Sequence, residues 1–156
     1  DTKGHLGQSV YIRELHDRED GPPPPVDLAL ERLNGDFVRD VIISGLVSAC
    51  HDISDGGILV SVAEMAMGGG IGAEIDVDNG DISAHAWLFG EDQGRYIIST
   101  NDPEAVVSKA MAAGVHASKI GHVGGKDLKL SNGEVISVGK LKSQNERWLP
   151  EYMGAA

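Results

Sequence analysis

The 156 residues include one cysteine, Cys50, so an internal disulfide is excluded. Cys50 ends the apolar run 46–50, and this position predicts a buried, reduced thiol of the kind found in cytosolic proteins. Catalysis by this thiol with His51 as its base is disfavoured, because adjacent residues on a strand point to opposite faces. Aromatic residues make up only 4% of the chain, so we expect a core of Val, Ile, Leu, Ala and Met.

Basic residues are also scarce, with 13 Lys and Arg against 24 Asp and Glu and a formal net charge of −11. Such a surface repels nucleic-acid backbones and anionic lipids, so we expect neither as a partner. The sequence has no signal peptide and no apolar run of about 18 residues, which favours a cytoplasmic location. A small phosphorylated ligand remains compatible with this charge, because local amides, a metal ion or one arginine can overcome the overall field.

Hydrophobic periodicity and turn residues predict alternating strands and helices without a strict βαβ order. The fold class we expect is α+β, with a mixed or antiparallel sheet and helices packed mainly on one face. The expected elements are a strand at 8–13, a helix or two helices capped by Asp36 at 28–44, a buried strand at 46–50, a helix from Ile58 to the glycines 68–70, strands at 71–77, 96–100 and 118–123, a helix from Asp102, a hairpin at 128–138 around Asn132-Gly133, and a short helix at 143–152.

We expect one domain over residues 1–156, in which residues 1–26 hold the first strand and a proline-rich connector. The prolines 22–25 lead directly into Val26-Asp27 and a helical pattern, so they predict a rigid entrance to that helix. The sequence begins with Asp1 and has no initiator methionine, and from this we expect a piece of a longer protein.

The most informative motif is His-Asp-Ile-Ser-Asp-Gly-Gly at residues 51–57, between an apolar run and an amphipathic helix. The backbone amides of Gly56 and Gly57 at a helix start suit a phosphate, and the carboxylates of Asp52 and Asp55 suit a divalent cation. An equally weighted alternative is structural, with Asp55 as an N-cap and the glycines as a tight turn. The His-Asp pair also resembles that of metal phosphohydrolases, but further histidines at ligand spacing are missing, and a zinc site is disfavoured.

A second motif, Gly-Glu-Asp-Gln-Gly-Arg at residues 90–95, lies at the start of a predicted strand. Such a turn can offer Gln93 and backbone amides to a ligand, while Arg95 makes a bidentate bond to phosphate or carboxylate. Arg95 is equally suited to bridging to Glu91 or Asp52 and only holding the fold together. If both motifs serve one phosphate and its metal, they must be neighbours in space.

These motifs, taken in order, resemble the C-terminal domain of the phosphoribosylformylglycinamidine synthase large subunit (formylglycinamide ribonucleotide amidotransferase), within the aminoimidazole ribonucleotide synthetase-like fold family. The resemblance spans nearly the whole chain. It rests on Leu-Gly-Gln-Ser (6–9), Pro-Pro-Pro-Val-Asp (23–27), His-Asp-Ile-Ser-Asp-Gly-Gly (51–57), Ala-Glu-Met-Ala (63–66) and Leu-Phe-Gly-Glu-Asp-Gln-Gly-Arg (88–95).

The resemblance implies part of an ATP-dependent carbon–nitrogen ligase of purine biosynthesis. It converts formylglycinamide ribonucleotide, glutamine-derived ammonia and ATP to formylglycinamidine ribonucleotide, ADP and phosphate. The family's large subunit holds two copies of an N-domain and C-domain pair, and this chain resembles the second C-domain. The implied partners are the rest of the large subunit, a glutaminase subunit and a small accessory subunit, and the fragment alone is expected to be inactive.

The resemblance also implies a site that uses Mg²⁺ and ATP or ADP. Asp52 corresponds to a Mg²⁺ ligand of the first copy, and the segment 91–93 corresponds to one that touches substrate. No catalytic residue is implied, since the family's catalytic histidine belongs to an N-domain outside this chain. The implied nucleotide- or phosphate-binding residues are Asp55, Gly56, Gly57, Glu91, Gln93 and Arg95.

Two alternatives stay open beside this interpretation. One is a non-catalytic domain that binds a phosphorylated metabolite or mediates assembly. The other is the C-terminal domain of a different ATP-dependent member of the same fold family, such as aminoimidazole ribonucleotide synthetase, selenophosphate synthetase or thiamine-monophosphate kinase.

Overall fold

A computed structural model describes residues 2–78 and 80–154 and divides the chain into two compact units. The first unit comprises Asp1–Ser61 and Asn79–Lys119, and the second comprises Val62–Asp78 and Ile120–Ala156. The helices are α1 (Val10–His16), α2 (Leu28–Ile43), α3 (Gly57–Gly69), α4 (Ala84–Phe89), α5 (Pro103–Ala112) and α6 (Val138–Tyr152). The strands are β1 (Ala49–Ile53), β2 (Ala73–Ile75), β3 (Arg95–Ser99), β4 (Gly121–Val123), β5 (Asp127–Leu130) and β6 (Val135–Ser137).

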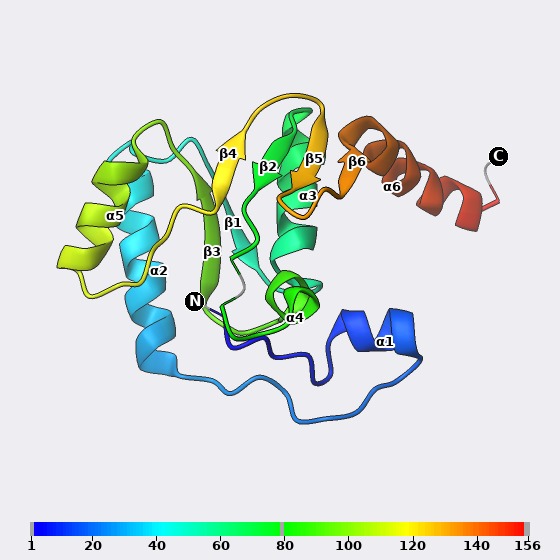
Figure 1. Cartoon of the computed structure of the whole chain (residues 1–156), viewed down its shortest axis with the longest axis horizontal. Helices are drawn as coiled ribbons and strands as arrows, with labels where there is room; N and C mark the ends of the chain where they lie inside the picture. The colour runs from blue at the N-terminus through cyan, green and yellow to red at the C-terminus, as the bar shows by residue number, and fades with distance from the viewer. Residues whose placement is uncertain (1, 79, 155–156) are drawn as a thin grey trace. The chain divides into compact units, whose positions relative to one another are not determined.

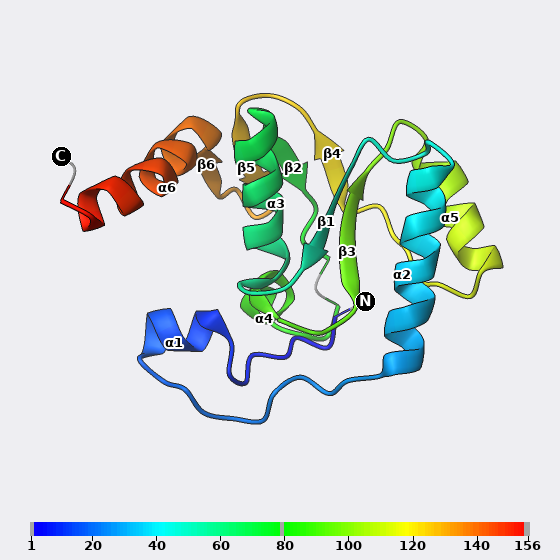
Figure 2. The same ribbon diagram turned by 180° about the vertical axis from the view of Figure 1, so that it is seen from behind.

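The first unit is built on the antiparallel pair β1–β3, in which Asp52 lies opposite Tyr96. Figures 1 and 2 show these strands side by side, with α2 alongside them. Asp27 caps α2 by accepting from the amides of Ala29 and Leu30, and Asn34 of α2 donates to the carbonyl of Gly94. The buried apolar side chains of this unit are Val41, Ile53, Ile58, Ala86, Trp87, Leu88, Val106 and Ala110.

The second unit is a four-stranded mixed sheet in the order β4-β2-β5-β6. β2 runs parallel to β5 and antiparallel to β4, while β5 and β6 form an antiparallel hairpin closed at Asn132-Gly133. Ser137 then caps α6 by accepting from the amide of Lys140. The buried apolar side chains of this unit are Val62, Ala66, Ala73, Ile75, Leu128 and Val138.

The expected fold class, α+β with mixed and antiparallel sheets, is confirmed. The elements with strong local signals also lie where the sequence predicts them. Asp102 accepts from the amide of Ala105 and Pro103 opens α5, α3 ends among the glycines 68–70, and the Asn132-Gly133 hairpin forms. The helix expected at 143–152 is present and begins earlier, at Val138.

The predicted strand at 8–13 is wrong, because these residues enter α1 instead. Ser9 caps this helix by accepting from the amide of Ile12, and the ring of Tyr11 lies 4.9 Å from that of Phe89. A side-chain cap and an aromatic contact therefore outweigh the alternating pattern of polar and apolar residues.

Of the two alternatives for residues 28–44, the structure has the single helix, since α2 runs uninterrupted through Asn34-Gly35-Asp36. The Asn34 amide is bound to the Gly94 carbonyl and so does not compete with its own helix backbone. Gly35 lets the hydroxyl of Tyr96 approach closely, since a Cβ at residue 35 would lie 3.3 Å from that oxygen.

The expected burial of Cys50 is wrong. The residue is exposed, because β1 begins only at Ala49 and buries only Ile53. Partial desolvation raises the pKa of the Cys50 thiol, and the negative charge of Asp52 raises it further. A thiol that stays protonated at neutral pH is a poor nucleophile, which agrees with the non-catalytic role expected for it.

Candidate functional site

The two motif loops meet in the first unit. Oε1 of Glu91 accepts hydrogen bonds from the backbone amides of Gly56, at 2.7 Å, and of Val10, at 2.8 Å. The prediction that residues 51–57 and 90–95 are neighbours in space is therefore confirmed. A third segment, the start of α1, joins them, and this contact was not predicted from the sequence.

The turn between β1 and α3 requires glycine for two reasons. Gly56 and Gly57 both have positive φ, at +78° and +69°, a region that residues with a Cβ rarely adopt. A Cβ on Gly57 would also lie 2.6 Å from the backbone carbon of Phe89. The glycines thus bring the first motif against the end of α4, directly beside the second motif.

Both glycine amides of this turn have acceptors within the protein. The Gly56 amide donates to Glu91, and the Gly57 amide donates to the carbonyl of Ser54 at 3.1 Å. Both residues are buried. The phosphate cradle expected from the sequence is therefore filled, in this conformation, by the protein's own oxygens.

Arg95 lies at the first position of β3 and turns its guanidinium back onto the second motif. It donates to the carbonyl of Gly90 at 3.1 Å, and its Nη1 lies 3.8 Å from a carboxylate oxygen of Asp92. Burial lowers the pKa of Arg95, while the charge of Asp92 opposes that change. The ionic partner of Arg95 is thus Asp92, neither of the two carboxylates considered from the sequence.

Asp92 is a site residue that the sequence reasoning missed. The residue is 9% exposed, and its carboxylate accepts hydrogen bonds from the hydroxyl of Thr2 and from the amides of Lys3 and His5. Burial alone raises the pKa of Asp92, but these hydrogen bonds and the charge of Arg95 outweigh it and place the pKa below its ordinary value. Its partners lie far away along the chain, so no local signal could have identified it.

The remaining predicted residues Asp52, Asp55 and Gln93 are exposed at the surface of the first unit. Oδ1 of Asp52 lies 3.7 Å from Nδ1 of His51. Across residues 2–78 and 80–154, no three His, Cys, Asp or Glu side chains cluster closely enough to hold a metal ion. Asp52 and Asp55 therefore each offer Mg²⁺ a single carboxylate, which suits an ion whose other ligands are water and ligand phosphates.

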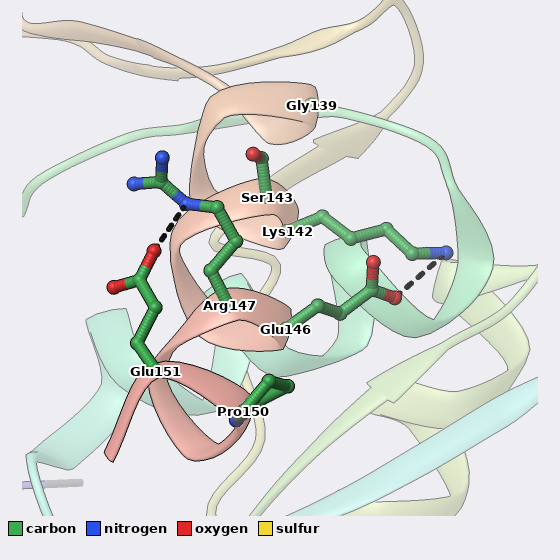
Figure 3. Close-up of a pocket in the computed structure, with 7 residues that line it drawn as sticks. All are labelled: Gly139, Lys142, Ser143, Glu146, Arg147, Pro150 and Glu151. Atoms are coloured by element: carbon green, nitrogen blue, oxygen red, sulfur yellow. Dashed lines mark ion pairs between the residues drawn. The ribbon is translucent and has the colours of Figure 1, made fainter. Parts of the chain in front are cut away.

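A surface hollow of about 510 Å³ lies elsewhere, along α6 in the second unit. Figure 3 shows that its lining side chains come from this one helix and that two ion pairs, Lys142–Glu146 and Arg147–Glu151, join them. The charges of this surface are paired with one another, and the hollow contains none of the predicted site residues. It does not extend the candidate site.

Comparison with known proteins gives a consistent result. The chain is 51% identical over 159 residues to the phosphoribosylformylglycinamidine synthase subunit PurL of Parvibaculum lavamentivorans, covering 99% of this chain and 21% of that protein. It is 50% identical over 155 residues to the PurL subunit of Caulobacter vibrioides, with 99% and 21% covered. The chain thus spans about a fifth of the length of the curated relatives it matches.

Solved structures support the same fold. Phosphoribosylformylglycinamidine synthase II from Thermotoga maritima matches 89% of this chain and 24% of its own at a TM-score of 0.68 and 16% identity. The T. maritima PurL structure complexed with ATP matches 88% of this chain and 24% of its own at a TM-score of 0.67 and 17% identity.

Within the described residues, no helix is both long and apolar enough to cross a membrane. The resemblance drawn from the sequence motifs is confirmed by relatives of high identity along the whole chain. The domain family described as AIR synthase related protein, C-terminal domain, matches residues 3–131. The chain therefore belongs to the AIR synthase related protein family and carries its C-terminal domain.

Proposed function

We propose that this chain is the C-terminal part of an ATP-dependent amidotransferase of purine biosynthesis, in the cytoplasm. The whole enzyme converts formylglycinamide ribonucleotide, glutamine-derived ammonia and ATP to formylglycinamidine ribonucleotide, ADP and phosphate. The observation that carries this proposal is the identity of about half of all residues to PurL subunits over nearly the whole chain. T. maritima PurL structures titled as complexes with FGAR, ATP and ADP support the substrate and nucleotide.

The chemistry requires activation of an amide oxygen, which is a poor leaving group. Phosphoryl transfer from ATP converts that oxygen into a good leaving group, and ammonia then displaces phosphate at the same carbon. Mg²⁺ bound with the nucleotide would offset the negative charge that gathers on the phosphates. In this chain the proposed metal ligand is Asp52. The proposed nucleotide- or phosphate-binding residues are Asp55, Gly56, Gly57, Gln93 and Arg95, and Glu91 lies beside them, bound to the Gly56 amide.

The chain contributes a scaffold and part of a cleft in this proposal. The rest of the large subunit supplies the other part, and a glutaminase subunit and a small accessory subunit complete the assembly. A T. maritima structure titled PurLQS supports partners of this kind. The occupied amides of Gly56 and Gly57 favour a second, non-catalytic role for this domain itself, as a module for assembly.

The proposed function predicts activity for the full-length protein and none for this chain. With ATP, Mg²⁺, ammonia and formylglycinamide ribonucleotide, the full-length protein is expected to form the amidine and release ADP. The isolated 156 residues are expected to form none, because the catalytic groups lie outside them. Mass spectrometry of the reaction mixture measures amidine formation for both proteins. Amidine formation by the isolated chain, or its absence with the full-length protein, would contradict the proposal.

Replacement of Asp52 tests the proposed metal ligand in the full-length protein. Asp52→Asn removes a charged oxygen ligand without changing side-chain size, so we expect the Mg²⁺ concentration for half-maximal ATP binding to rise about tenfold. The matched control is Asp40→Asn, another exposed carboxylate of the first unit. Titration of nucleotide binding against Mg²⁺ gives the answer, and equal Mg²⁺ dependence in both variants would remove Asp52 from the site.

A further inference from the structure

The loop 90–95 holds two adjacent carboxylates, and each one binds a part of the chain distant in sequence. Asp92 binds the backbone amides of Lys3 and His5, and Glu91 binds the amides of Val10 and Gly56. We name residues 2–10 the N-terminal segment. This segment is thus attached to the second motif at both of its ends, and Glu91 also binds the first motif.

The position of Glu91 matters because of the group it binds. A carboxylate oxygen that accepts from a glycine amide at a helix start occupies the kind of position that a phosphate oxygen takes in anion sites. One oxygen atom, Oε1, serves both the Gly56 amide and the Val10 amide. An anion that takes the Gly56 amide must therefore displace the same oxygen that holds Val10.

We propose that Glu91 is a positioning residue that ties the N-terminal segment to the Gly56–Gly57 turn and closes the Gly56 amide to anions while it does so. The carboxylate of Glu91 contacts protein amides and does not contact the ligand. Glu91 therefore affects the anion site indirectly, through the Gly56–Gly57 turn. The closure of the Gly56 amide can be tested with an inorganic anion. Only the step from such an anion to a bound nucleotide rests on the proposed function. Because binding free energies are reciprocal, an anion at the turn also loosens Val10.

Amide hydrogen exchange tests the tie in the 156-residue chain. Glu91→Ala removes the acceptor of both amides, so exchange at Val10 and Gly56 is expected to accelerate about tenfold or more. Ala110, a buried residue of helix α5, provides the internal reference, and its exchange should not change. Asp40→Ala, which removes an exposed carboxylate of the same unit, should change none of the three rates. Unchanged exchange at Val10 and Gly56 in Glu91→Ala would overturn the tie.

Binding of inorganic pyrophosphate with Mg²⁺ tests the closure. Glu91→Ala is expected to bind this anion about tenfold more tightly than the parent chain and than Asp40→Ala, with the Gly56 amide resonance shifting on addition. The comparison with Asp40→Ala separates the removal of a particular contact from the removal of one negative charge. Equal or weaker binding by Glu91→Ala, or no binding by any of the three proteins, would overturn the closure.

These outcomes are separable from the fate of the proposed function. Pyrophosphate binding and amide exchange require no catalysis, so both keep their meaning if the full-length protein forms no amidine. Conversely, an active full-length enzyme whose Glu91→Ala fragment binds pyrophosphate no better than its parent would retain the function and lose this inference.

Discussion

Replacing Gly57 by alanine is expected to destabilise the first unit by about 3–5 kcal/mol. The residue has a φ of +69°, and its new Cβ would lie 2.6 Å and 2.7 Å from two backbone atoms of Phe89 and 2.8 Å from the carbonyl oxygen of Leu88. Backbone cannot move aside as a flexible side chain can, so α4 and the start of α3 must separate. Urea unfolding followed by the fluorescence of buried Trp87, in a Trp148→Phe background, measures the effect.

Gly45→Ala is the matched control, since Gly45 has a φ of +74° with nothing within 4 Å of its would-be Cβ. It carries the same backbone strain without the collision, and we expect a loss of about 1–2 kcal/mol. The difference between the two variants isolates the close approach of the first motif to α4. Equal losses of unfolding free energy in the two variants would mean that Gly57 and Phe89 lie farther apart than in this structure.

Replacing Asp92 by asparagine is expected to cost the first unit about 2–4 kcal/mol at neutral pH. The substitution removes the charge that faces Arg95 and brings amide hydrogens toward the donors on Thr2 and Lys3. Unfolding by urea, followed through Trp87, measures the change against Asp40→Asn as control. Equal stability of the two variants would show that the N-terminal segment contributes little to the unit.

The same carboxylate makes the effect depend on pH. The pKa of Asp92 is lower in the folded chain than its ordinary value, so the unfolded chain takes up a proton first as the pH falls. The stabilisation is therefore complete above about pH 4 and is lost as the pH falls toward the folded pKa. The difference between the parent and Asp92→Asn should shrink correspondingly below about pH 4, and a difference that grows in acid would contradict this assignment.

Elements with local signals could be predicted from the sequence. The Asn132-Gly133 hairpin and the start of α5 at Asp102-Pro103 depend on residues that lie next to one another. The strand predicted at 8–13 failed because α1 is selected partly by contacts outside the segment, including that of Tyr11 with Phe89. Local pattern alone contains no information about such partners.

In the candidate site too, some features could be predicted from the sequence and others depend on contacts distant in the chain. The proximity of the two motifs could be predicted, because their residue types suggested a common ligand. The donors that Glu91 and Asp92 bind could not be predicted, since any of the chain's backbone amides could in principle serve. Knowledge of the fold was needed to show that the Gly56 amide already has an acceptor and that Arg95 faces Asp92.

The order of strands in the second unit has a consequence for synthesis on the ribosome. β2 pairs on both sides with strands made much later, Ile75 lying opposite Gly121 in β4 and Leu130 in β5. The segment Asn79–Lys119, which belongs to the first unit, lies between β2 and β4 in the sequence and is synthesised between them. The strand Ala73–Ile75, whose two outer residues are buried in the folded sheet, therefore leaves the exit tunnel without its partners. The nascent chain can complete its first unit before the sheet of its second unit can close.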